Sequence, residues 1–108
     1  MSALPTVAVT YPWPADVLAV AADRQANQYL DPLLEGTRRL FPTGEIKVFV
    51  EHDPELAGET HLVFEVEAPS SAIPNYVKAQ HFWIDELYRV CPAPDVSLFR
   101  LALIPVAT

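Results

Sequence analysis

Three kinds of residue are scarce in this chain of 108 residues. The single cysteine, Cys91, cannot form an internal disulfide, and Cys and His are nowhere spaced as in a zinc site. The three glycines are isolated, whereas a phosphate-binding loop needs several close together. Seven basic residues stand against fourteen acidic ones, giving a net charge of −7. This charge argues against nucleic-acid binding, because phosphate contacts need clustered Lys and Arg.

Long apolar runs are missing as well. No run approaches the roughly 20 residues that cross a bilayer, and residues 1–14 lack the basic start and apolar core of a signal peptide. We therefore expect a cytoplasmic protein with no membrane partner. The length is typical of one domain, residues 1–108. With half of its residues apolar, the chain can form a core without a metal, a disulfide or a cofactor.

The clearest positive pattern is a β-hairpin in the middle of the chain. Apolar residues alternate with mostly polar ones over residues 45–51 and again over 60–67. This is the period-two pattern of strands that bury one face. The connector, residues 52–59, contains Pro and Gly, as expected for a hairpin with a longer loop.

Helical segments flank this hairpin. Residues 15–40 are helical in composition, with a break expected at Asp31–Pro32, where an N-cap residue precedes Pro. A second helix is predicted over residues 71–91, and residues 96–106 alternate again as the last strand. The predicted buried face of the second helix comprises Ile73, Val77, Ile84, Leu87, Tyr88 and Cys91.

This order of elements predicts an α+β fold. We expect a two-layer sandwich in which two helices cover one face of an antiparallel sheet. If the β-branched run at residues 6–10 forms a first strand, the order (β)αββαβ resembles the split βαβ arrangement of ferredoxin-like folds. Without that strand, a three-stranded sheet with the same helix layer remains.

The helix-free side of the predicted sheet carries apolar residues that alternate out of phase with the core. Phe49, Val63 and Leu98 are the candidates for a dimer face. Two interpretations are open: scattered apolar side chains on an open surface, or a contiguous patch that pairs with a second copy. Small ferredoxin-like domains often dimerise through this face, so by analogy of fold we predict a homodimer.

Acidic residues concentrate around the hairpin connector. Six of the fourteen acids lie between residues 51 and 67, with no Lys or Arg among them. They either protect the hairpin edge from pairing with other strands or bind a basic protein partner. Phe82 adds an apolar ring on the polar face of the second helix, where a partner or another segment must cover it. The partner-binding candidates are Glu51, Asp53, Glu55, Glu59 and Phe82.

Histidines provide weaker candidates for chemistry. His52 and His61 flank the connector, and one register places Glu51 opposite His61. Two His near carboxylates can bind a divalent metal, but a surface pair is the more common arrangement, so no metal site is predicted. His81 has no nucleophile spaced to complete a triad, so no catalytic residue is assigned.

These observations favour a small acidic, non-catalytic binding or regulatory module that acts through protein–protein contacts. The alternative is a small-molecule sensor or a small cofactor-independent enzyme with a pocket between helices and sheet. Tyr76, His81 and Trp83 are the candidate residues of that pocket. Convergent polar groups in an enclosed apolar pocket would favour the alternative, whereas an exposed apolar patch would favour the module.

Overall fold

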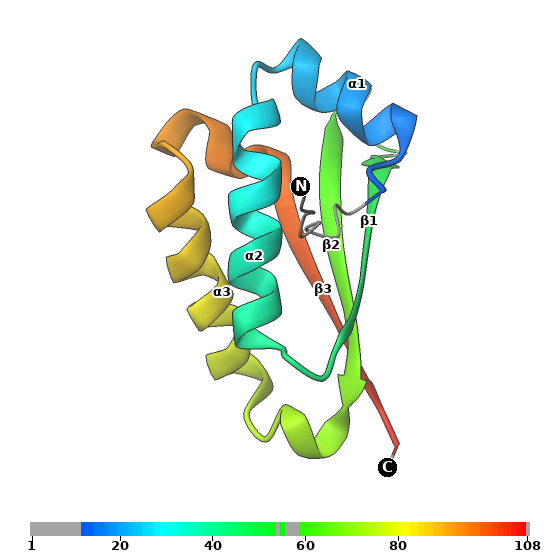
Figure 1. The fold of residues 1–108 in the computed structure, drawn as a ribbon, viewed down its shortest axis with the longest axis vertical. Helices are drawn as coiled ribbons and strands as arrows, with labels where there is room; N and C mark the ends of the chain where they lie inside the picture. The colour runs from blue at the N-terminus through cyan, green and yellow to red at the C-terminus, as the bar shows by residue number, and fades with distance from the viewer. Residues whose placement is uncertain (1–11, 54, 56–58, 108) are drawn as a thin grey trace, which may run out of the picture.

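Figure 1 shows helices packed beside a three-stranded sheet in the computed structural model, which describes residues 12–107 except 54 and 56–58. The elements are α1 (Ala15–Asp23), α2 (Leu30–Leu40), β1 (Glu45–His52), β2 (Thr60–Pro69), α3 (Tyr76–Val90) and β3 (Phe99–Val106), with short 3-10 helices at Asn27–Tyr29, Ser70–Ala72 and Ala93–Leu98. α2 and α3 run side by side, and α1 lies across the end of the sheet where β1 leads into β2. The predicted α+β class is confirmed.

The β1–β2 hairpin forms as the sequence predicts. The two strands are antiparallel, and Val48 pairs with Phe64 while Glu51 pairs with His61. Leu62, Phe64 and Val66 of β2 all point to the helix side and are fully buried. Alternation with a period of two therefore identified both the strands and their buried face.

The pairing of the last strand corrects the expected sheet. β3 lies beside β2 in parallel, so the sheet is mixed and has the order β1-β2-β3. Parallel neighbours need a crossover connection, which α3 supplies between β2 and β3. In a split βαβ arrangement another strand would separate these two, whereas here they are direct neighbours. Residues 6–10 lie outside the described residues, and the ferredoxin-like order is not confirmed.

The break in the first helical region is confirmed, but it comes earlier than predicted. α1 ends at Asp23, and Gln25 adopts the left-handed backbone conformation, with a φ of 55°. Pro32 lies in the first turn of α2, where its missing N–H costs no intrahelical bond. Asp31 is not the N-cap of α2. Its carboxylate instead accepts a hydrogen bond of 2.9 Å from the indole N–H of Trp13.

α3 begins five residues later than predicted. Asn75 is its N-cap, and its side-chain oxygen accepts a hydrogen bond of 3.0 Å from the backbone N–H of Lys78. Pro74 disfavours helical geometry at the residue before it, so Ile73 cannot continue a helix from residue 71. β3 likewise starts at Phe99 rather than at residue 96, because residues 93–98 form a 3-10 helix.

Phe64 lies at the centre of the core. Its ring packs against Trp13, Trp83 and Phe99, with ring centroids 6.3, 6.0 and 6.2 Å away. The Trp83 indole N–H donates a hydrogen bond of 2.9 Å to the hydroxyl of Thr37, which donates in turn to the Leu33 carbonyl at 2.7 Å. This chain of hydrogen bonds satisfies the polar groups that α2 and α3 bury between them.

α2 and α3 approach closely at Gly36. A Cβ atom on Gly36 would lie 2.3 Å from Oε2 of Glu86, so the missing side chain makes room for this carboxylate. Glu86 accepts hydrogen bonds from Arg89 and, at 2.9 Å, from Arg39 of α2. The hydrogen bond from Arg89 is the largest effect that lowers the pKa of Glu86, and it outweighs the opposing effect of burial.

Candidate functional site

α3 places large apolar side chains on its outer surface. Val77, Ile84 and Tyr88 are 61, 41 and 59% exposed. Their spacings of seven and four residues put them on one side of the helix, and we call these three residues the outer stripe. Trp83, which was not predicted to be buried, lies in the core together with Leu87, which was.

The buried face predicted for the second helix is correct for Ile73, Leu87 and Cys91 and wrong for the three residues of the outer stripe. A helix that touches both a sheet and a second helix must bury the arc that contacts both neighbours. On α3 this arc is centred on Trp83, which bonds to α2 and packs against Phe64 of β2. Ile84 and Tyr88 lie away from this arc and stay exposed.

The outer stripe borders a groove between α3 and β3. The groove has a volume of about 280 Å³, and its lining includes Gln80, Ile84, Leu87, Phe99, Arg100 and Leu101. Because Ile84 belongs to both features, the stripe lies on the side of α3 that faces β3. Within the described part of the chain, β3 has a neighbouring strand on one side only, so its other backbone edge is unpaired.

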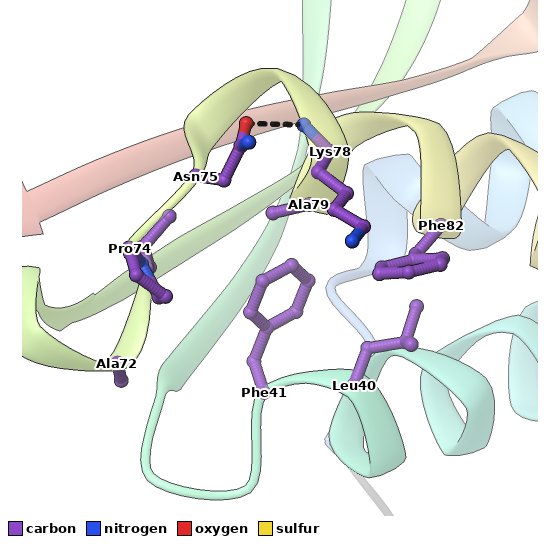
Figure 2. Close-up of a pocket in the computed structure, with 9 residues that line it drawn as sticks. Leu40, Phe41, Ala72, Pro74, Asn75, Lys78, Ala79 and Phe82 are labelled. Carbon is purple, nitrogen blue, oxygen red and sulfur yellow. Dashed lines mark hydrogen bonds between the residues drawn. The ribbon is translucent and has the colours of Figure 1, made fainter.

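A second groove of about 170 Å³ lies where the end of α2 meets the start of α3. Figure 2 shows Leu40 beside the ring of Phe82, with Phe41 nearby. Phe82 is 49% exposed, and the Lys78 ammonium lies 5.9 Å from its ring centroid, within the range of a cation–π contact. α2 therefore covers one part of the Phe82 ring and leaves the other part accessible, so a partner contact at Phe82 stays a prediction.

The acidic candidates gather at one end of the hairpin. Glu51, Glu55 and Glu59 are exposed, whereas Asp53 is partly buried. A carboxylate oxygen of Asp53 accepts a hydrogen bond of 2.8 Å from the backbone N–H of Glu55, and the Asp53 N–H donates to the Glu59 carbonyl at 2.9 Å. Asp53 is thus bonded to Glu55 and Glu59, and the side chains of Glu51, Glu55 and Glu59 are exposed to solvent. Docking of a basic partner here stays a prediction.

The two histidines at the connector do not face each other. His52 pairs with Thr60, and its Nδ1 lies 3.2 Å from the Thr60 hydroxyl. His61 pairs with Glu51 one position along, so its side chain points to the opposite face of the sheet. His61 is buried, with Nε2 3.6 Å from a Glu59 carboxylate oxygen. Among the residues that the structure describes, no group of three His, Cys, Asp or Glu side chains is arranged to hold a metal.

The three dimer-face candidates do not share an exposed surface. Phe49 is 37% exposed on the helix-free side, as expected. Val63 is buried, and Leu98 lies in the 3-10 helix before β3, where it belongs to the hydrophobic core. The predicted interface needs correction, because buried side chains cannot contact a second copy. Leu98 was misplaced because the last strand starts one residue after it.

The three residues of the alternative pocket are separated as well. Tyr76 and His81 are exposed, whereas Trp83 is buried in the core with its N–H bonded to Thr37. His81 and Trp83 are two residues apart on a helix, so their side chains point about 200° apart. The structure therefore does not bring these side chains together around one pocket.

Cys91 is unsuited to nucleophilic chemistry. Its side chain is buried, and burial, followed by the charge of Asp95, raises the pKa of the thiol to about 11. The thiol is therefore neutral near pH 7, and the thiolate is the reactive form of cysteine.

Sequence reasoning missed the outer stripe by assigning its residues to the core. One signal could have revealed it. His81 lies between Val77 and Ile84 at helical spacing, so the supposed buried face contained a titratable residue. In the structure His81 is exposed, on the same side of α3 as the stripe.

Among the described residues, no helix is long and apolar enough to cross a membrane. In comparisons with known proteins, the chain matches no family model, no curated protein and no solved structure.

Proposed function

We propose that this protein is a small, non-catalytic binding module that acts through contact with another protein. The outer stripe of α3 carries the proposal, because three large apolar side chains on one side of a helix are each more than 40% exposed. Contiguous exposed apolar surface marks interaction sites, and Tyr is enriched in protein interfaces. A cytoplasmic location stays a prediction from the sequence.

The small-molecule alternative has less support. Its candidate residues are separated, with Trp83 in the core and Tyr76 on the surface. Of the three candidates, only Trp83 lines the groove between α3 and β3, and none lines the groove beside Phe82.

A matched pair of variants tests the proposal. Ile84 of the outer stripe and Leu18 of α1 are both aliphatic, helical and 41% exposed. Tagged wild type, Ile84→Glu and Leu18→Glu are incubated with a lysate of the source organism that also contains the untagged protein, and retained proteins are identified by mass spectrometry. We expect wild type and Leu18→Glu to retain the same partner and Ile84→Glu to lose it. Identical retained proteins for all three would contradict the proposal.

A further inference from the structure

The net charge of this protein is distributed unevenly along the chain. From residue 76 onward, three basic and three acidic side chains balance: Lys78, Arg89 and Arg100 against Asp85, Glu86 and Asp95. The net charge of −7 is therefore carried entirely by the residues before α3. Two copies of the chain repel each other wherever their acidic residues meet, whereas contact between two α3–β3 sides brings no net charge together.

Some charges of α3 are already paired within one copy. Glu86 is bonded to Arg39 and Arg89 on the side of α3 that faces α2. These three charges lie away from the outer stripe, which faces β3. The stripe can therefore be covered without breaking the ion pairs of Glu86, and His81, which lies on the same side of α3, would be covered with it.

β3 has little of the protection that exposed edge strands usually carry. Arg100 is its one charged residue, and residues 101–104 are uncharged and apolar. Pro105, which lacks an N–H, comes near the end of the strand. Natural proteins place charges or prolines along such edges, or cover them. Among the described residues, an apolar strand edge therefore lies next to an apolar helix stripe, and one partner that covers both would supply a strand and a helix surface.

We propose that this cover is a second copy of the chain. The two β3 strands pair antiparallel across a twofold axis, and the two outer stripes pack against each other. This inference rests on the proposed function and names its partner. A twofold contact is self-complementary, and paired strands lie about 4.8 Å apart. The α3 helices above them then come within the 8–10 Å of packed helices. Ile84, near the middle of the stripe, lies close to the axis, and Val77 faces Tyr88 of the other copy.

Sedimentation of the full chain at micromolar concentration tests the assembly. We expect wild type and Leu18→Glu to sediment at twice the monomer mass of 12.0 kDa. Ile84→Glu should weaken the dimer by about 100-fold, because its carboxylate would be buried without a partner. Far-UV circular dichroism of both variants checks that they fold. A wild-type monomer at every concentration, or equal effects of the two variants, would overturn the inference.

Salt separates this interface from docking through the acidic connector. The dimer should tighten between 50 and 500 mM NaCl, because salt screens the repulsion between the two acidic halves. Association driven by Glu51, Glu55 and Glu59 with a basic surface would weaken over the same range. A dimer that weakens with salt would therefore contradict the neutral interface.

Two further measurements locate the contact. Ile84→Cys should form an intermolecular disulfide with oxidised glutathione, because residues beside a twofold axis meet their own copy, whereas Leu18→Cys should not. Hydrogen exchange at residues 99–104 should be slower in wild type than in Ile84→Glu, because pairing covers the edge of β3. Crosslinking at Leu18 alone, or equal exchange, would overturn the proposed geometry.

Failure of this inference can be distinguished from failure of the proposed function. If the chain is monomeric and Ile84→Glu still loses a different protein from the lysate, the second copy is wrong and the binding module stands. If the chain is monomeric and Ile84→Glu loses nothing, both are wrong.

Discussion

The inner and outer faces of α3 differ in what their side chains contact. The inner face includes an indole N–H bonded to Thr37 and a carboxylate bonded to two arginines above Gly36. The outer face exposes Val77, Ile84 and Tyr88. Which side chains of α3 are buried therefore depends on which ones meet contacts on a neighbouring element. The apolar character of a side chain does not by itself determine whether it is buried.

Truncating one aromatic residue on each face gives the largest expected difference. Trp83→Ala should lower the free energy of unfolding by about 3–5 kcal/mol, because it leaves a cavity beside Phe64 and removes the partner of Thr37. Tyr88→Ala should change it by less than about 0.5 kcal/mol. Urea denaturation in the Ile84→Glu background excludes effects of association. Similar losses for both variants would mean that the two faces of α3 are wrongly assigned.

A smaller effect should appear where α2 meets the inner face. Ala in place of Gly36 would gain up to about 1 kcal/mol of helix propensity, but its Cβ would lie 2.3 Å from Oε2 and 2.4 Å from Cγ of Glu86. We expect a net loss of about 1–2 kcal/mol, because Glu86 must move. In a Glu86→Ala background the overlap disappears, so Gly36→Ala should become stabilising. The same sign in both backgrounds, measured by urea denaturation, would contradict this close approach.

The smallest expected effect is the pH dependence of the inner ion pairs. The hydrogen bond from Arg89 lowers the pKa of Glu86 below its ordinary value of 4.5. A lowered pKa means that the stabilisation is fully present above about pH 4.5 and is lost as the pH falls through the lower, folded-state value. Wild type should therefore lose more thermal stability than Glu86→Gln between pH 6 and pH 3. The difference should be small, because both arginines are largely exposed. Equal losses would show that this pairing does not contribute.

The hairpin could be predicted from the sequence because its pattern is local. Alternation over residues 45–51 and 60–67, with a connector that contains Pro and Gly, determines both the strands and their buried face. The parallel pairing of β3 with β2 could not be predicted, because the long connection through α3 permits more than one neighbour. The orientation of α3 depends on its contacts with α2. These contacts are the hydrogen bond from Trp83 to the Thr37 hydroxyl and the close approach of Glu86 to Gly36. Single residues such as Thr37 and Gly36 form no periodic pattern in the sequence, so these contacts could not be predicted from it. The candidate site was missed for the same reason.

The placement of the two tryptophans has an optical consequence. Trp13 precedes α1 and Trp83 lies in α3, yet both rings pack against Phe64. These are the only tryptophans of the chain, so its indole emission arises from the surroundings of one ring, Phe64, with Trp83 buried and Trp13 partly buried. Tryptophan fluorescence therefore reports, as a single signal, whether α3 and the residues just before α1 are packed against β2. Opening of the connector around Asp53 and Glu59, at the end of the hairpin, would leave that emission unchanged.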